Sequence, residues 1–387
     1  MKACVVGLGK AGLPLAAVMA DAGIEVIGYD LDKKRVAEIN SGENPLPEED
    51  GLAELLKKHG GKKLKATTDI KDAKDAKAYI VLVPLFLDSK NKPDMSILTA
   101  AFKQVASVLS DGDLVVLETT VPPGTTQTIV KKILDKSGKK YLLAYSPERI
   151  MTGYSISRFR QFPKVVGGID EQSTKAAQQL YTIFSKNVVP VRDAKTAEMV
   201  KVAEGVFRDV NISLANELYM VCEKAGVDFW QMRQAASHTF CNIHEPGMVG
   251  GHCIPVYPWF LINNYDVPLI RLARKLNEKM IDYYADKAAK IAGKKGKIGI
   301  VGLSYRAGVK ETSHTKAHAL IRKLKKRGLS VWGLDPLLTA EEVEQHFKIP
   351  HLHDPSKMDA FILTDKIAGA NLPAEKTVDL KNALTKN

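Results

Sequence analysis

The chain has 387 residues, which is long for a single hydrophobic core and predicts two or three domains. Four irregularly spaced cysteines are too few for a disulfide framework, so we expect a reducing, cytoplasmic compartment. The longest apolar run, residues 80–87, contains a proline and is too short to span a bilayer, and no apolar signal precedes the first predicted strand. The net charge of +12 comes from scattered lysines, which favours a solvated basic surface for anionic small molecules over a nucleic-acid partner.

The first thirty residues carry a dinucleotide-binding pattern. A short apolar strand at residues 3–6 precedes Gly7, Gly9 and Gly12, and a helix at 13–20 and a strand at 24–29 follow before Asp30. The glycines allow a tight turn, close approach of the backbone to a pyrophosphate, and close packing of helix on strand. An acidic residue at this distance binds ribose hydroxyls and repels a 2′-phosphate, so the pattern predicts NAD rather than NADP. A plain structural turn is the alternative.

Buried parallel strands follow, because residues 79–83, 114–117 and 142–144 are nearly continuous apolar runs. The second run leads into TTVPPGTT, residues 119–126, which opens another helix. The third leads into Ser146-Pro-Glu-Arg149. Functional groups of an open parallel sheet gather at the carboxyl ends of its strands, so we expect both loops near the nucleotide.

A long helix without proline is predicted over residues 196–224. Its polar residues Lys201, Glu204, Arg208 and Asn211 are spaced three, four and three positions apart, which places them on one face. Apolar residues cover much of the remainder, so the helix is expected to be central. A basic stripe on such a helix favours an anionic ligand over a solvated face.

Residues 248–260, MVGGHCIPVYPWF, present Cys253 after paired glycines. Paired glycines let the backbone approach another group closely. The thiol is either a covalent catalyst or a buried structural cysteine. The chain then returns to a nucleotide-fold pattern, with strands at 297–301, 329–334, 361–364 and 377–380 and a helix at 315–327. Residues 304–314 form a longer loop in place of the glycine triplet.

Seven motifs in order resemble the UDP-glucose/GDP-mannose dehydrogenase family over nearly the whole chain. The FRDVNI segment and the PER loop most resemble the branch acting on UDP-N-acetylmannosamine. The motifs are GLGKAGLPLA at Gly7, INSGENPLPEEDGL at Ile39, TTVPPGTT at Thr119, SPERIMTG at Ser146, EMVKVAEGVFRDVNISLANEL at Glu198, GGHCIPV at Gly250 and GLSYRAGVKET at Gly302.

The resemblance implies an α/β protein with two Rossmann-like doubly wound domains joined by a long-helix dimerisation region. It divides the chain into an NAD-binding domain at 1–192, a helical catalytic and dimerisation region at 193–292, and a domain for the UDP of the sugar at 293–387. It also implies a homodimer that oxidises a sugar C6 alcohol to a carboxylate with two NAD molecules.

The resemblance also assigns roles to residues. Cys253 is the nucleophile that forms a thioester, Lys201 stabilises the oxyanion, and Glu148 positions or activates water with Thr120 nearby. The expected cofactor contacts are Gly7, Gly9, Lys10, Ala11, Gly12, Asp30, Arg35, Leu85 and Thr120. The expected substrate contacts are Arg149, Lys201, Arg208, Asn211, His244, Gly250 and Arg306.

Five positions depart from the family pattern. An aspartate is usual where this chain has Tyr257, an asparagine where it has Gly205, a threonine where it has Leu85, and arginines where it has Phe240 and Ser313. A paralogue that binds both ligands without completing the oxidation is therefore one alternative. A dehydrogenase for another nucleotide sugar, such as UDP-glucose, is a second. A hydroxy-acid dehydrogenase that needs no cysteine is a third. A zinc site is a fourth, built from His238, Cys241, His244, His252 and Cys253.

Overall fold

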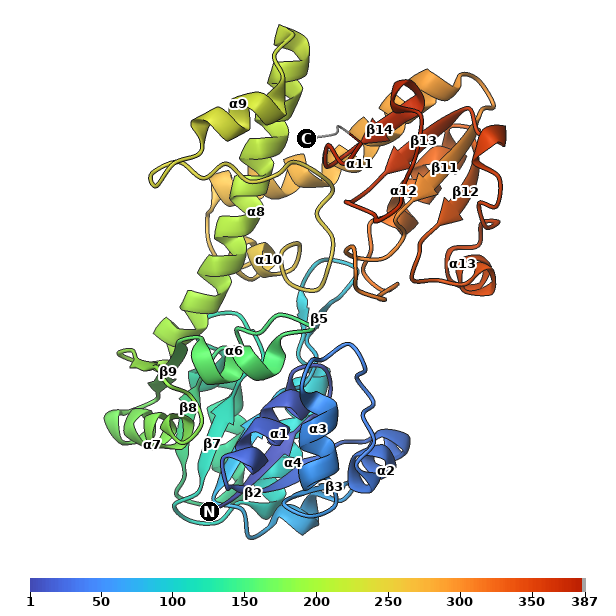
Figure 1. The fold of residues 1–387 in the computed structure, drawn as a ribbon. Coiled ribbons are helices and arrows are strands. Elements are labelled where there is room, and N and C mark those ends of the chain that lie inside the picture. The colour runs from blue at the N-terminus through green and yellow to red at the C-terminus, as the bar shows by residue number, and fades with distance from the viewer. Residues whose placement is uncertain (385–387) are drawn as a thin grey trace. The chain divides into compact units, whose positions relative to one another are not determined.

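The computed structural model describes residues 1–384, which form two compact units that divide between residues 204 and 205, each described by itself below (Figure 1). The boundary falls inside α8, Ala194–Ala225, which confirms the predicted long helix. The α/β class with two parallel-type sheets and a helical central region is confirmed as well. The three-part division at 192 and 292 stays a prediction.

An eight-stranded sheet forms the centre of the first unit, in the order β10-β9-β8-β7-β4-β1-β2-β3. Neighbouring strands are parallel except at the antiparallel β8–β9 pair. The predicted strands are found within two residues of their expected bounds. The strands are β1 Lys2–Val6, β2 Glu25–Tyr29, β3 Leu64–Thr67, β4 Ala78–Val81, β7 Leu114–Leu117, β8 Leu142–Tyr145, β9 Lys164–Gly168 and β10 Val188–Pro190, with a separate hairpin of β5 Phe86–Leu87 and β6 Pro93–Asp94.

Both faces of this sheet are buried under helices, which explains the continuous apolar runs. Along β1, Ala3 and Val5 pack on one face while Cys4 and Val6 pack on the other, as the two-residue period of a strand requires. The first face is covered by α1 Gly12–Asp21, α3 Leu52–His59, α6 Ser155–Gln161 and α7 Glu171–Thr182, and the second by α4 Ser96–Val108 and α5 Lys131–Leu134, while α2 Lys33–Ser41 follows β2.

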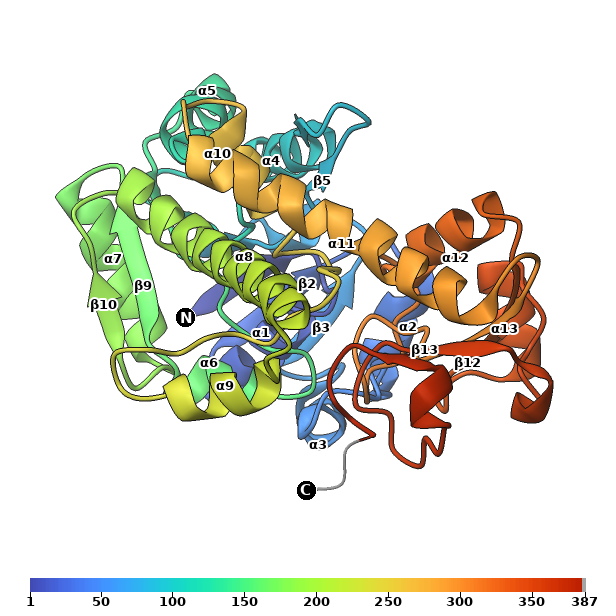
Figure 2. The same cartoon turned by 90° about the horizontal axis from the view of Figure 1, so that it is seen from above.

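The second unit holds a four-stranded parallel sheet in the order β12-β11-β13-β14. Residues of α11, α12 and α13 share one apolar cluster with the strands, and Figure 2 shows α11 running from α10 to this sheet with α12 beside it. The elements are α9 Phe229–Ala236, α10 Tyr257–Ile262, α11 Pro268–Ala292, β11 Lys297–Val301, α12 Ala317–Lys326, β12 Ser330–Leu334, α13 Ala340–Phe347, β13 Ala360–Leu363 and β14 Thr377–Asp379.

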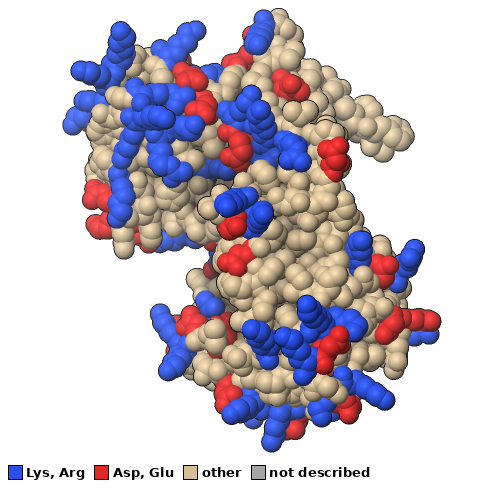
Figure 3. Space-filling view, turned by 180° about the vertical axis from the view of Figure 1, so that it is seen from behind, with Lys and Arg blue, Asp and Glu red and all other residues tan. Residues whose placement is uncertain are grey.

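Charged side chains crowd the surface of the second unit, where Figure 3 shows many Lys and Arg with Asp and Glu between them. Several are ion pairs between α11 and α12. Lys323 lies 2.7 Å from Asp282, and Arg327 lies 2.7 Å from Asp286. Exposed pairs of this kind contribute little stability each.

Candidate active site

The glycine loop after β1 has the geometry that a dinucleotide needs. Gly7 has φ +92°, and a Cβ there would lie 2.3 Å from the Leu82 carbonyl oxygen. A Cβ at Gly12 would lie 1.8 Å from the Gly7 carbonyl oxygen, so the helix can begin this close only without a side chain. A Cβ at Gly9 would meet nothing within 4 Å. The bare backbone at Gly9, with Lys10 and Ala11 leading into α1, therefore faces open space.

Asp30 stands at the carboxyl end of β2, beside this loop. Its carboxylate accepts hydrogen bonds from the Leu8 amide at 2.7 Å and the Asp32 amide at 2.9 Å. The Arg35 guanidinium lies 3.5 Å from Asp30 and 3.6 Å from Asp32. The fold thus brings the predicted cofactor residues Asp30 and Arg35 together, and Arg35 is paired with carboxylates.

The loops after β4 and β7 are joined by one threonine. The Thr119 hydroxyl accepts from the Val83 amide at 3.0 Å and donates to the Val83 carbonyl at 2.8 Å. Leu85 packs, partly buried, against the apolar cluster under α4, and Thr120 is buried. Leu85 therefore presents an apolar side chain where the family pattern has a hydroxyl.

The Glu198 carboxylate binds the TTVPPGTT loop, residues 119–126. Its carboxylate accepts from the Gly124 amide, from the Thr126 amide at 2.8 Å and from the Thr126 hydroxyl at 2.6 Å. Burial raises the pKa of Glu198 to about 7, although these hydrogen bonds oppose the shift. The sequence analysis gave Glu198 no role, because only its position inside a quoted motif drew attention to it.

Glu148 and Lys201 lie together in the first unit, on the loop after β8 and on α8. The Lys201 ammonium is 3.7 Å from the Glu148 carboxylate, and Lys201 is buried. The Arg149 guanidinium donates to the Pro163 carbonyl at 2.9 Å, pairs with Glu204, and covers the Phe162 ring at 4.6 Å. Two predicted catalytic groups are thus neighbours, whereas Arg149, predicted to bind substrate, is engaged with protein groups.

A buried ion pair supports the loop that carries Glu148. The Lys164 ammonium donates to Glu118 at 2.7 Å and to the Pro147 carbonyl at 3.4 Å, and the Tyr181 hydroxyl also donates to Glu118. Burial lowers the pKa of Lys164 and raises the pKa of Glu118, while their mutual attraction opposes both shifts. The sequence analysis missed this pair. Its only signal was a lysine within the otherwise apolar β9 and a glutamate ending β7.

Cys253 is exposed, on a turn of the second unit. Its carbonyl oxygen accepts from the Val256 and Tyr257 amides, each at 3.0 Å. Gly251 has φ +93°, its amide donates to the His314 carbonyl at 3.0 Å, and a Cβ there would lie 2.4 Å from Cε2 of Tyr305. Burial raises the pKa of Tyr305, and the charge of Cys253 adds to that shift. The paired glycines thus let this segment pack against the loop at 304–314.

Gly250, the other paired glycine, lies against the same loop, since a Cβ there would be 3.2 Å from the His314 carbonyl oxygen. Arg306, from this loop, is half-buried. It forms an isolated bridge with Val309.

The remaining predicted substrate residues surround the second-unit part of α8. Arg208 is exposed, and Asn211 donates to the Phe207 carbonyl of its own helix at 2.8 Å. The His244 ring centroid lies 6.1 Å from that of Phe207. Burial lowers the pKa of His244, and the charge of Arg208 adds to the effect. Asn211 therefore turns back on its helix, a contact that the helical spacing did not predict.

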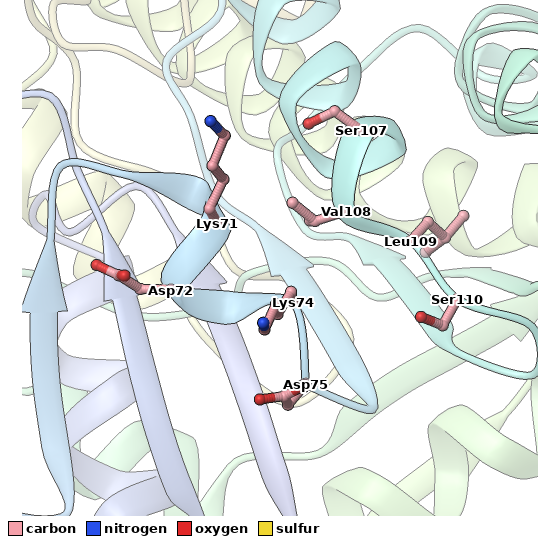
Figure 4. A pocket seen from close by; sticks show the side chains of 8 residues that line it. All are labelled: Lys71, Asp72, Lys74, Asp75, Ser107, Val108, Leu109 and Ser110. Atoms are coloured by element: carbon pink, nitrogen blue, oxygen red, sulfur yellow. The ribbon is translucent and has the colours of Figure 1, made fainter.

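A large surface hollow of about 910 Å³ lies elsewhere in the first unit (Figure 4). Its walls are residues 71–75, which precede β4, and residues 107–110, which precede β7. It therefore lies at the amino ends of the strands, whereas ligands of open parallel sheets bind at the carboxyl ends. We assign it no part in the chemistry.

Two further expectations concern metal and membrane. Within residues 1–384, no three or more His, Cys, Asp or Glu side chains gather as a metal ion requires. His238 instead accepts from the Phe240 amide at 3.1 Å, so its ring serves the local turn. In the same described part of the chain, no helix is both long and apolar enough to cross a bilayer.

The glycine loop and Asp30 are typical of NAD-binding dehydrogenase folds. Comparison with known proteins identifies the family. Residues 1–185 match the NAD binding domain of the UDP-glucose/GDP-mannose dehydrogenase family, and residues 195–279 match its central domain. The chain belongs to this family and is an oxidoreductase by class.

Several relatives are similar over most of the chain. A UDP-N-acetyl-D-mannosamine dehydrogenase of Methanocaldococcus jannaschii is 37% identical over 335 residues, 85% of this chain and 77% of the relative. An NDP-N-acetyl-D-galactosaminuronic acid dehydrogenase of Ralstonia nicotianae is 36% identical, over 89% of this chain and 83% of the relative. The solved UDP-D-ManNAc dehydrogenase of Pyrococcus horikoshii has a TM-score of 0.89 at 30% identity, covering 100% of this chain and 97% of that one.

Proposed function

We propose that the protein is an NAD-dependent 6-dehydrogenase that oxidises the C6 alcohol of a UDP-sugar to the uronate through a cysteine thioester. UDP-N-acetylmannosamine is the proposed substrate. The observation that carries the proposal is the exposed thiol of Cys253 on a turn packed against the loop of Arg306. The names of the relatives support an N-acetylated sugar.

The proposed chemistry uses groups that this chain supplies. NAD, when bound, would supply the hydride acceptor for both oxidations. The Cys253 thiolate adds to the aldehyde carbon after the first oxidation, forming a C–S bond, and loss of the second hydride leaves a thioester. Lys201 stabilises the negative oxygen on that carbon. Water then breaks the C–S bond, with Glu148 accepting its proton, and releases the carboxylate and the thiolate.

The residues expected to hold the ligands follow from the same assignment. Gly9, Asp30 and Thr120 serve the cofactor, together with Gly7, Lys10, Ala11, Gly12, Arg35 and Leu85. The bare, open backbone at Gly9 supports this assignment. The substrate contacts are Arg149, Lys201, Arg208, Asn211, His244, Gly250 and Arg306.

The decisive experiment measures NADH formed per sugar consumed, with a panel of nucleotide sugars. The overall balance is one alcohol, two NAD⁺ and one water giving one carboxylate, two NADH and three protons. We expect two NADH per UDP-N-acetylmannosamine. Cys253→Ser should abolish the second oxidation, and Cys241→Ser, at a half-buried thiol, is the matched control that should leave it intact. Full turnover of Cys253→Ser would contradict the mechanism.

A second candidate is a paralogue that binds NAD and the nucleotide sugar but does not complete the oxidation. The observation that favours it is the absence of the usual polar groups at positions 205 and 257, where the backbone of α8 and a tyrosine ring meet instead. Binding of both ligands by calorimetry without any change in absorbance at the NADH band would support this candidate.

We also propose a homodimer formed through α8. Phe207, Leu214 and Val221 follow one another at seven-residue spacing and are 62%, 49% and 54% exposed. The apolar residues of α8 predicted a central helix, but Leu214 and Val221 lie at the surface of the single chain. Apolar residues at this spacing form the seam between paired helices. Sedimentation equilibrium should give a dimer for the wild type and a monomer for Leu214→Glu.

A further inference from the structure

Gly205 is a buried residue in the interior of α8, where a glycine is costly. A glycine inside a helix destabilises it relative to alanine, because the glycine backbone loses more conformational freedom on folding. A Cβ at Gly205 would lie 2.4 Å from Cδ2 of Tyr257, 3.1 Å from its Cβ and 3.2 Å from its Cγ. Even alanine would therefore displace the tyrosine. The bare helix backbone is the surface on which this ring packs.

Tyr257 connects that surface to Cys253. Its side chain is buried, and its ring centroid lies 5.8 Å from that of the fully buried Phe260. Its amide donates to the Cys253 carbonyl at 3.0 Å, within the turn that opens α10. The position of the ring on α8 therefore fixes the position of the turn, and the turn carries the thiol.

The other side of the same turn is held in the same manner. A Cβ at Gly251 would lie 2.4 Å from the Tyr305 ring, just as a Cβ at Gly205 would overlap Tyr257. Two aromatic rings, each seated on a glycine, thus hold the segment of Cys253 from both ends. Neither contact relies on an ion pair.

We propose that Gly205 and Tyr257 act as a matched pair, in which Tyr257 is a positioning residue that sets the Cys253 thiol by packing on bare helix backbone. The two departures from the family pattern are then physically coupled, because the ring fills the space that an asparagine at 205 would need. The proposal rests on the proposed function only in taking Cys253 as the nucleophile.

A double-mutant cycle on the full-length protein tests the pair. The variants are Gly205→Asn, Tyr257→Asp and the double variant, with Ala203→Asn as the control for helix propensity, since residue 203 is exposed on the same helix. Three quantities are measured: the rate of iodoacetamide modification of Cys253 by peptide mass spectrometry, with Cys241 as internal reference; hydrogen exchange at residues 256–257; and Tm.

Each single variant should change the Cys253 modification rate by about threefold or more, since residues in contact couple at this level. Exchange at 256–257 should accelerate, and Tm should fall by several degrees. The double variant should return within about twofold of wild type. Tyr257→Phe and Ala203→Asn should leave the rate and the exchange unchanged.

Additive losses in the double variant would overturn the proposal, as would a Tyr257→Phe variant as altered as Tyr257→Asp. If Gly205→Asn does not fold, Gly205→Ala with and without Tyr257→Leu provides the same cycle. Failure of every sugar to yield NADH would remove the proposed function, whereas these thiol and exchange measurements would still report on the pair.

Discussion

The first strand of each unit ends in the same structural frame. In the first unit the Leu8 amide donates to Asp30 at 2.7 Å, and in the second the Leu303 amide donates to Asp335 at 2.8 Å. Each aspartate ends the neighbouring parallel strand, and each leucine follows a glycine with φ of +92° or +93°. The two units thus repeat one strand–turn–strand design.

The loops that follow make the units different. In the first unit the helix begins five residues after Gly7, because Gly12 sits against the Gly7 carbonyl, and Gly9 faces open space. In the second unit a longer loop intervenes, with Tyr305 packed against Gly251 and Arg306 half-buried. The tight loop suits a pyrophosphate on backbone amides, whereas the long loop presents side chains.

The two aspartate carboxylates also differ in their exposure and in the number of protein amides that donate to them. Asp335 is 2% exposed and accepts from the Leu303, Ser304 and Leu337 amides. The Asp30 side chain is 13% exposed and accepts from two amides beside Arg35. The same residue at the same place is therefore a structural cap in one unit and an accessible carboxylate in the other.

The largest effect is expected from adding a side chain at Gly12 in the tight loop. Gly12→Ala puts a methyl group into backbone that cannot yield, so NAD affinity measured by calorimetry should fall by about 100-fold or more, within the range of severe overpacking. Gly308→Ala in the long loop meets nothing within 4 Å and strains only a φ of +76°, which costs about 1–2 kcal/mol. An equal loss of NAD affinity in Gly12→Ala and Gly308→Ala would show that the two loops do not differ in cofactor binding.

The next effect concerns Glu198, which supports only the first unit. Its pKa of about 7 in the folded protein exceeds the ordinary glutamate pKa of 4.5, so folding favours the protonated form. This stabilisation is full below pH 4.5 and is lost as pH rises through about 7, on the order of 3 kcal/mol in total. Relative to Glu198→Gln, the wild type should lose unfolding free energy between pH 5 and pH 8 in urea titrations. Exposed Glu25→Gln should show no such trend.

Exchanging the two aspartates for asparagine should separate their roles. Asp335→Asn should lower the free energy of unfolding by about 2 kcal/mol, because three amides lose a charged acceptor, and should leave NAD affinity intact. Asp30→Asn should weaken NAD binding by about tenfold and should reduce the preference for NAD over NADP. If Asp335→Asn weakened NAD binding as much as Asp30→Asn does, the two aspartates would not have separate roles.

The smallest effect is expected for Arg306, in the long loop at residues 304–314. Arg306→Ala should raise the KM for the nucleotide sugar by about tenfold, the value of one charge-assisted contact, with no change in the Kd for NAD. Lys310→Ala in the same loop is the control, because Lys310 is already paired with Glu342 at 2.7 Å. A change in NAD binding instead would place Arg306 at the cofactor.

The local patterns of the chain determined part of its secondary structure. The order of strand, glycines, helix, strand and Asp30 is read within thirty residues, and the close contact of Gly12 with the Gly7 carbonyl lies within the same segment. The strands that were predicted agree with the structure to within two residues, since helices cover both faces of the first sheet, whereas β3 and β9 were not predicted. The long helix α8 followed from its stretch without proline and from the helical spacing of its polar residues.

Contacts between distant positions were decided only by the tertiary structure. Lys164 finds Glu118 46 residues away, and Glu198 reaches Thr126 across 72 residues. The sequence analysis treated Gly205 and Tyr257 as two separate departures, and the fold shows them to be one contact. No local rule reveals such pairs, because their energy lies in the burial of groups that only the folded chain brings together.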